Sequence, residues 1–207
     1  MVAEVWYVAY GSNMCGARLS RYLARCRDRC EPRESRAVVV PGAVYFATES
    51  AVWGGGRGFY DPGADGVVWA RAHLLTAGQF SDIVAQEMYR EVGGGTGGGG
   101  DGELDLAAVV ACGRVEFGTG RYETVVCAGE LDGLPMLTFT APWAMDEVEH
   151  REPSEAYLRL LVAGLREAGA WSADEIAGYL AALPGAVGRW SAEEILGIAP
   201  TPSGEPD

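Results

Sequence analysis

The sequence predicts a single domain, over residues 1–199, that contains both strands and helices. The chain has 207 residues, which is enough for one domain with a substantial apolar core. Runs of β-branched and aromatic residues, separated by Gly, Pro and Asp turn signals, predict strands. Apolar residues at helical spacing, preceded by Ser or Thr caps, predict helices.

Charge and composition disfavour several classes of protein. The formal net charge is −13 at pH 7, which disfavours binding to nucleic acid or to an anionic membrane. No apolar run is long enough to span a bilayer, and the N-terminus lacks a signal pattern, so we expect a cytoplasmic protein. The five cysteines include no Cys-x-x-Cys pair, and the two histidines lie far apart in sequence. We therefore expect reduced thiols and no metal site.

Residues 4–10 are predicted to form the first strand, because β-branched and aromatic residues dominate them. A polar turn follows at Tyr10–Met14, where Gly11 can adopt unusual dihedrals and the next two residues can cap a helix over residues 14–30. The N–H groups of such a junction converge on one point, and the helix dipole adds positive potential there. The turn therefore suits a carboxylate or a phosphate, although an ordinary structural turn has the same pattern.

The polar face of that helix is rich in arginine. The arginines are Arg18, Arg21, Arg25, Arg27 and Arg29. We interpret them as a solvated face paired with acidic neighbours, and a basic binding patch is the alternative.

The next strands are predicted over residues 38–47, with a break at Pro41-Gly42, and over residues 67–75. Between them, residues 53–60 are rich in glycine and lack the lysine of a phosphate loop. We interpret this segment as a bend that brings the backbone close to another group, such as the wall of a ligand site.

Thr76 and Gln79 have the form of a capping box and predict a helix over residues 77–90. At about 100° per residue, Glu87 lies in the middle of the apolar stripe of this helix. A carboxylate at the centre of a buried face is costly unless it is paired or functional. Glu87 is therefore a candidate functional group, and a boundary glutamate that reaches solvent or an arginine is the alternative.

The second half of the chain begins with a run of eight glycines in the ten residues 93–102. It predicts a flexible loop, which either closes over a site or is a passive insertion. Strands are predicted over residues 107–117, 121–128 and 136–140, and a disordered tail over residues 200–207.

Ser154 is predicted to cap a late helix that carries Tyr157 in its first turn, where the ring can pack while the hydroxyl reaches polar groups. Two further segments, residues 171–176 and 190–195, repeat the pattern Trp-Ser-Ala-acid-Glu-Ile. Each predicts a capping box and the start of a helix, not a functional repeat.

Three pieces of this sequence, in order, resemble the γ-glutamylcyclotransferase-like family. Tyr10-Gly11-Ser12-Asn13 is similar to the family's signature turn, Glu87 to its catalytic glutamate, and Pro153-Ser154-x-x-Tyr157 to its late Pro-Ser-x-x-Tyr element. The resemblance covers residues 5–167. It implies an α+β fold, a small mixed β-barrel with helices packed outside, and release of 5-oxoproline from a γ-glutamyl amide without metal or cofactor.

In the implied reaction, the α-amine of the substrate attacks its own γ-carbonyl and closes a five-membered ring, so no enzyme nucleophile is needed. The resemblance makes Glu87 the catalytic general base, with a pKa raised by apolar surroundings. The N–H groups of the turn would face substrate oxygen atoms, and Tyr157 would orient the γ-glutamyl group. The candidate substrate-binding residues are Tyr10, Gly11, Ser12, Asn13, Met14 and Tyr157.

The expected partner is a small γ-glutamyl compound, bound by a monomer or a homodimer. Its leaving group is open, because Met88–Arg90 replace an expected glycine and the glycine run has no counterpart in the family pattern. The candidates for the leaving group are an amino acid, an amine, glutathione and a protected natural-product intermediate, as in the butirosin pathway. One rival hypothesis is a ligand-binding or interaction protein that kept the fold and lost catalysis. The other is an amidohydrolase that uses Cys15 with His73 or His150.

Overall fold

The computed structural model describes residues 2–92 and 104–198, so the predicted glycine loop 93–102 and the tail 200–207 lie outside the described residues. The chain divides into two compact units. Unit 1 comprises Met1–Val8, Ser20–Arg36 and Ala72–Pro142. Unit 2 comprises Ala9–Leu19, Ala37–Arg71 and Trp143–Asp207. The single domain expected over residues 1–199 stays a prediction.

The strands of the described residues form one mixed sheet and one hairpin. The strands are β1 (Glu4–Ala9), β2 (Ser35–Pro41), β3 (Ala43–Glu49), β4 (Gly56–Asp61), β5 (Val67–Thr76), β6 (Arg114–Glu116), β7 (Thr124–Leu131) and β8 (Leu134–Thr140). The six-stranded sheet has the order β2-β5-β1-β8-β7-β6, and β3 pairs with β4 alone. β1 runs parallel to β8, with Trp6 opposite Met136, whereas β7 is antiparallel to both of its neighbours. This mixed sheet confirms the α+β class, while the closed barrel stays a prediction.

The helices are α1 (Gly16–Leu23), α2 (Ala77–Glu87), α3 (Leu106–Cys112), α4 (Glu155–Ala168), α5 (Ala173–Ala182) and α6 (Ala192–Leu196). Two short 3₁₀ turns are η1 (Ser12–Met14) and η3 (Met145–Glu147). The predicted capping box of Thr76 and Gln79 is confirmed at α2. Ser154, Ser172 and Ser191 cap α4, α5 and α6 as the sequence predicts.

Three predicted elements are wrong in type or extent. The helix expected over residues 14–30 starts after η1 and ends at Leu23, because a tertiary contact takes the backbone N–H of Arg27. The strand expected over residues 107–117 is α3 followed by β6. The bend expected over residues 53–60 contains most of β4.

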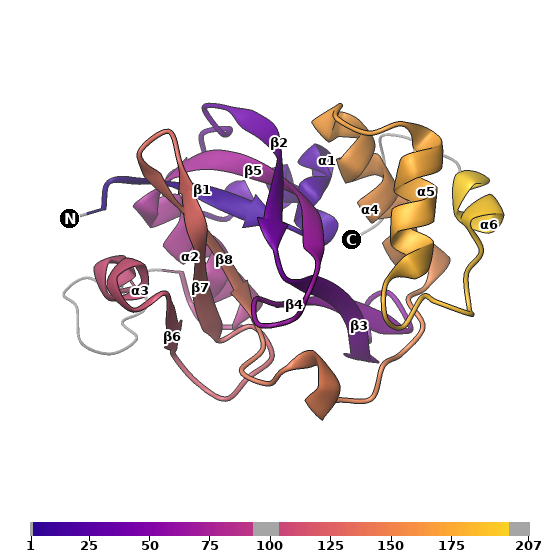
Figure 1. Cartoon of the computed structure of the whole chain (residues 1–207). Helices are drawn as coiled ribbons and strands as arrows, with labels where there is room; N and C mark the ends of the chain where they lie inside the picture. The colour runs from indigo at the N-terminus through magenta and orange to yellow at the C-terminus, as the bar shows by residue number, and fades with distance from the viewer. Residues whose placement is uncertain (1, 93–103, 199–207) are drawn as a thin grey trace. The chain divides into compact units, whose positions relative to one another are not determined.

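In unit 1, the ring of Tyr7 on β1 lies at the centre of an aromatic core. It stacks on Phe139 of β8 with 5.5 Å between ring centroids, and Phe80 of α2 lies 5.7 Å away. Figure 1 shows the long β7–β8 hairpin of this unit, and β8 pairs with β1. Burial of these rings attaches α2 to the sheet.

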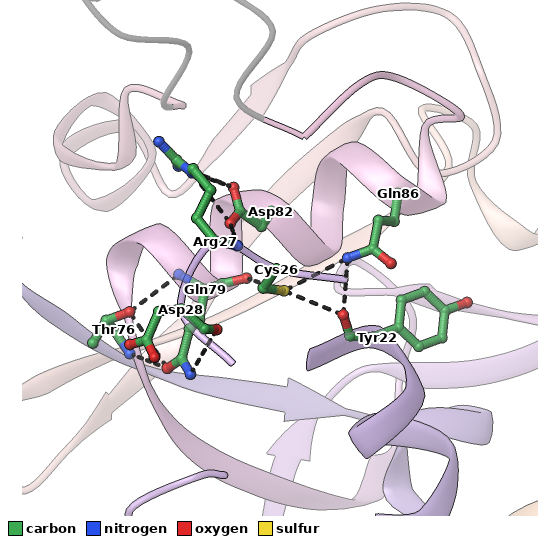
Figure 2. A network of polar contacts seen from close by, with 8 residues as sticks. All are labelled: Tyr22, Cys26, Arg27, Asp28, Thr76, Gln79, Asp82 and Gln86. Atoms are coloured by element: carbon green, nitrogen blue, oxygen red, sulfur yellow. Dashed lines mark hydrogen bonds and ion pairs between the residues drawn. The ribbon is translucent and has the colours of Figure 1, made fainter. Parts of the chain in front are cut away.

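Polar side chains fix α2 to the end of α1 and to the segment that follows it (Figure 2). Gln79, Asp82 and Gln86 recur at helical spacing on α2. The amide of Gln79 donates to the carbonyl of Cys30 at 2.8 Å, and that of Gln86 to the carbonyl of Tyr22 at 3.1 Å. Because three consecutive helical turns are bonded in this way, α2 has one orientation against residues 22–30.

Asp82 carries the charge of this network. Its side chain is only 2% exposed, and it accepts the backbone N–H of Arg27 at 2.9 Å and the Nε–H at 3.1 Å. For Arg27, pairing with an acidic neighbour is therefore confirmed. Burial, and then the charge of Asp82, raises the pKa of the adjacent Cys26 thiol to about 12, so this cysteine is not a thiolate near neutral pH.

In unit 2, aromatic stacking joins α5 to the first half of β5. Trp69 stacks on Tyr179 at 4.4 Å and on Trp171 at 4.8 Å, and its backbone N–H donates to the Tyr179 hydroxyl at 3.1 Å. In Figure 1, α4, α5 and α6 lie side by side. These contacts hold the helical part of unit 2 to its strands.

Asp82→Asn is expected to lower the free energy of unfolding by about 2 kcal/mol, because a buried, charge-assisted set of hydrogen bonds loses its charge. Urea denaturation measures the change. The matched control is Asp132→Asn, which removes the charge from a carboxylate that is 56% exposed and pairs with Arg36. Asp132→Asn should lower the free energy of unfolding by less than about 1 kcal/mol. Equal losses of stability in the two variants would contradict the structural role of Asp82.

Candidate functional site

The predicted site residues fall in both units. The Tyr10–Met14 turn and Tyr157 belong to unit 2, and Glu87 belongs to unit 1. Within unit 2 the structure brings the turn and Tyr157 together. The placement of Glu87 against them stays a prediction.

The turn is a short 3₁₀ helix and not the capped start of α1. Gly11 is its N-cap residue, no side chain caps it, and its carbonyl accepts the N–H of Met14 at 3.0 Å. Asn13 and Met14 are buried, whereas Gly11 and Ser12 are half-buried. In the part of the chain that the structure describes, the N–H groups of Gly11 and Ser12 donate to no protein acceptor. They are therefore available to a substrate oxygen atom.

Tyr157 reaches the backbone of this turn from α4. The ring is 4% exposed and packs edge-on against Phe46, while its hydroxyl oxygen accepts the backbone N–H of Gly58 at 3.2 Å. A Cβ atom on either Gly11 or Gly58 would lie 3.0 Å from this oxygen. Glycine at both positions therefore lets the phenol sit directly against two backbone segments.

The rest of α4 holds the turn from behind. Gly164 packs directly on it, because a Cβ atom there would lie 2.3 Å from the Cβ of Met14. One turn later, Glu167 accepts the N–H of Gly16 at 2.9 Å and pairs with Arg71, which donates to the carbonyl of Met14 at 2.9 Å. The carboxylate of Glu167 thus occupies the N-terminus of α1, which leaves the N–H groups of Gly11 and Ser12 as the candidate oxygen-binding groups of the turn.

Glu87 is the last residue of α2 and is half-buried. The backbone is fixed just before and just after it. Gln86 donates to the carbonyl of Tyr22, and Arg90 pairs with Glu123 and donates to the carbonyl of Phe117 at 3.3 Å. The carboxylate is therefore presented from a rigid position, as a general base requires. Its role as the base stays a prediction.

The cysteine hypothesis receives no support from the site geometry. Burial raises the pKa of the Cys15 thiol, and so does the charge of Glu167, which disfavours the thiolate that a nucleophile needs. His150 lies against the ring of Tyr45 at 5.9 Å, and its Nε2 atom lies 3.1 Å from the carbonyl oxygen of Met145. The Nδ1 atom of His73 is 2.8 Å from the hydroxyl of Ser35.

Among residues 2–92 and 104–198, no group of three or more His, Cys, Asp and Glu side chains could hold a metal ion. None of their helices has the length and apolar character needed to cross a membrane.

Sequence reasoning missed four residues of this arrangement: Gly58, Arg71, Gly164 and Glu167. Gly164 had a signal, since a glycine inside a leucine-rich helix usually has a packing reason. Gly58 lay in the glycine-rich segment interpreted as a close approach of the backbone. Arg71 and Glu167 had no signal in the sequence, because Arg71 lies 57 positions from Met14 and 96 positions from Glu167.

Comparisons with known proteins identify a shared fold. No family model matches the chain. Histone deacetylase 5 of Arabidopsis thaliana is 29% identical over 204 residues, a match that covers 86% of this chain and 30% of that protein. The chain therefore spans less than a third of the length of this relative.

Among solved structures, an uncharacterized human protein has a TM-score of 0.54 at 17% identity, over 94% of this chain and 98% of that one. A gamma-glutamyl cyclotransferase has a TM-score of 0.46 at 16% identity, over 93% and 98% of the two chains. YkqA from Bacillus subtilis has a TM-score of 0.47 at 16% identity, over 87% of this chain and 55% of that one. The human structure shows that its fold is shared by this chain.

Gly164→Ala is expected to lower the free energy of unfolding by about 2 kcal/mol, because the added methyl group must displace Met14 or move α4. Thermal or urea unfolding measures the loss. Gly178→Ala is the matched control, since a Cβ atom on this glycine of α5 meets nothing within 4 Å. The control should be neutral or stabilising by up to about 1 kcal/mol. A Gly164→Ala protein as stable as the wild type would refute the close contact.

Proposed function

We propose that this protein is a γ-glutamylcyclotransferase, which releases 5-oxoproline and an amine from a γ-glutamyl amide. The observation that carries the proposal is the buried Tyr157 hydroxyl, which lies against the backbone of Gly11 and Gly58 beside two N–H groups that have no acceptor among the described residues. The shared fold and the three sequence elements support it. The closed barrel implied by the resemblance is part of the same proposal.

Glu87 takes a proton from the α-ammonium group of the substrate, and the resulting amine attacks the γ-carbonyl carbon. The carbonyl oxygen becomes an oxyanion, which the N–H groups of Gly11 and Ser12 stabilise. The C–N bond of the amide then breaks as Glu87 returns its proton to the departing nitrogen. The ring nitrogen passes its second proton to the released amine, which leaves as an ammonium ion. The γ-glutamyl group leaves as 5-oxoproline, with no covalent enzyme intermediate.

Tyr157 serves as an orienting residue in this scheme. Its oxygen accepts the Gly58 N–H, which fixes the position of the hydroxyl group. From there the hydroxyl hydrogen-bonds a polar group of the γ-glutamyl moiety. Orientation matters because an intramolecular attack gains its rate from the alignment of amine and carbonyl.

The second candidate function is a ligand-binding or interaction module without catalysis. One observation favours it: the matching segment makes up 30% of a relative that is named for another activity, histone deacetylation. The two candidates share the fold and differ in whether Glu87 transfers a proton.

Glu87→Gln is expected to abolish release of 5-oxoproline, with at least about a thousandfold loss of kcat, because the amide cannot accept a proton. The assay incubates purified protein with γ-glutamyl amino acids, γ-glutamyl amines and glutathione, and measures 5-oxoproline by mass spectrometry. The control Glu91→Gln alters an exposed glutamate four residues further along. A wild-type protein that binds γ-glutamyl compounds without releasing 5-oxoproline would identify the binding module instead.

Tyr157→Phe is expected to lower kcat/KM by about tenfold to a hundredfold, because one orienting hydrogen bond to the substrate is lost while the ring still fills its site. Steady-state kinetics on one γ-glutamyl substrate measures the loss. Tyr89→Phe, at a position that is 78% exposed, is the control. Unchanged kinetics in Tyr157→Phe would remove the tyrosine from the mechanism.

A further inference from the structure

We propose that Arg90 and Glu123 form an ion-pair clamp that positions Glu87 for proton transfer. The inference rests on the proposed function and deepens it, because it makes two residues outside the three family elements positioning residues for the base. All of the contacts that carry it lie within unit 1.

The chain leaves α2 through a tight turn that includes Glu87. The N–H of Tyr89 donates to the carbonyl of Gln86 at 3.1 Å, and the N–H of Arg90 donates to that of Ala85 at 2.9 Å. These two bonds form a Schellman motif, in which glycine usually occupies the position of Tyr89. Because both bonds span Glu87, the backbone that carries its side chain is held only as firmly as this turn.

Tyr89 adopts a left-handed conformation that is unfavourable for tyrosine. Its φ value is 55°, so the end of α2 carries conformational strain. Its ring is 78% exposed, and the contact with the guanidinium carbon of Arg121, 5.1 Å from the ring centre, is weak at such exposure. A strained turn of this kind persists where the surrounding structure holds it in place.

Arg90 attaches this turn to the loop between β6 and β7. Its guanidinium group pairs with the carboxylate of Glu123 and donates to the carbonyl of Phe117 at 3.3 Å, so it bonds to both ends of the loop. The side chain of Glu123 is only 17% exposed. Removal of either partner would leave the other charge poorly solvated, which makes the pair costly to break.

The loop is folded around the Glu123 carboxylate. This carboxylate accepts the backbone N–H of Gly120, and the N–H of Phe117 closes the loop by donating to the carbonyl of Glu123 at 2.7 Å. A Cβ atom on Gly118 or Gly120 would lie 2.2 Å or 2.6 Å from Oε2 of Glu123, so the two glycines leave room for the carboxylate. The N–H of Gly120, and then Arg90, holds the pKa of the Glu123 carboxyl below its ordinary value, so it is charged at neutral pH.

The clamp matters because proton transfer depends steeply on the position of the base. A displacement of about 1 Å can lower the rate of a positioned reaction about a hundredfold. The candidate substrate-binding groups, in the Tyr10–Met14 turn and on Tyr157, belong to unit 2. Loss of the clamp should therefore lower kcat and leave substrate affinity unchanged.

Glu123→Ala is expected to lower kcat for γ-glutamylalanine by about tenfold to a hundredfold, with KM changed by less than about twofold. Arg90→Met should give a similar loss, and the double variant no larger one, because the two side chains act through one contact. Glu123→Gln keeps an acceptor oxygen and loses the charge, so its kcat should lie between those of Glu123→Ala and the wild type. Steady-state kinetics, at a temperature where each variant is folded, measures these values.

Hydrogen exchange tests the clamp without any substrate. The amides of Tyr89 and Arg90 should exchange at least about tenfold faster in Glu123→Ala, because their bonds close the clamped turn. Amides of β1 are the reference, since a general loss of stability would speed their exchange as well. Glu116→Ala is the matched control, because it removes a 54% exposed carboxylate that pairs with Arg114 within β6. It should change neither kcat nor the exchange of the turn.

The clamp is overturned if Glu123→Ala and Arg90→Met keep the wild-type kcat, or if exchange of the turn rises no more than that of β1. A rise in KM as large as the fall in kcat would also overturn it, because Glu123 would then act in substrate binding.

These outcomes are distinct from those of the proposed reaction. If exchange rises at the turn alone and the wild-type protein releases no 5-oxoproline, the clamp stands and the cyclotransferase proposal fails. If the wild-type protein releases 5-oxoproline at a kcat that neither variant changes, the reaction stands and the clamp fails.

Discussion

The close approach of α4 to the Tyr10–Met14 turn is the contact on which the arrangement of unit 2 depends. It exists because residue 164 has no side chain, since any Cβ atom there would overlap Met14. A glycine in a helix costs about 1 kcal/mol relative to alanine, and here the packing of helix on turn offsets that cost. Tyr157 lies two helical turns before Gly164, so the same docking that seats Gly164 delivers the phenol to Gly11. The half-buried N–H groups of the turn then keep their orientation without a cap of their own, because helix, arginine and glutamate fix the residues around them.

In unit 1 the comparable constraint is polar. A helix held only by apolar contacts can slide or rotate at little cost, whereas Gln79, Asp82 and Gln86 each require one particular backbone partner. Because the last of these bonds precedes Glu87 directly, the position of the carboxylate follows from the network. Both units therefore present their candidate functional groups from elements that are fixed at long range in the sequence, which is what pre-organisation of a site demands.

The sequence predicted those parts of the structure that depend on local chemistry. Capping boxes at Thr76, Ser172 and Ser191 and the strands predicted over residues 4–10, 38–47 and 67–75 were predicted correctly, because a cap or a strand is specified within a few residues. The end of α1 could not be predicted, since it depends on a hydrogen bond from Arg27 to a carboxylate 55 residues away. The strand predicted in place of α3 had another cause: the valines of Leu106–Cys112 outweighed the local helix signals of Asp105 and Gly113. In the candidate site, motif residues were recognised by resemblance, while their supports, Arg71 and Glu167, were visible only in three dimensions.

A shared fold does not decide between the two candidate functions, because folds carry many unrelated activities. The reaction proposed for this chain leaves only a small chemical difference between an enzyme and a binding protein. Ring closure within one substrate molecule requires alignment, an oxyanion site and one base, and the first two are also what a binding protein for the same ligand would possess. Conversion of one into the other therefore needs little more than the loss of a proton acceptor, with the turn and Tyr157 left in place. It follows that affinity for γ-glutamyl compounds reports on unit 2, and turnover reports on Glu87. The two measurements together locate this chain between enzyme and binding module more sharply than further comparison of folds can.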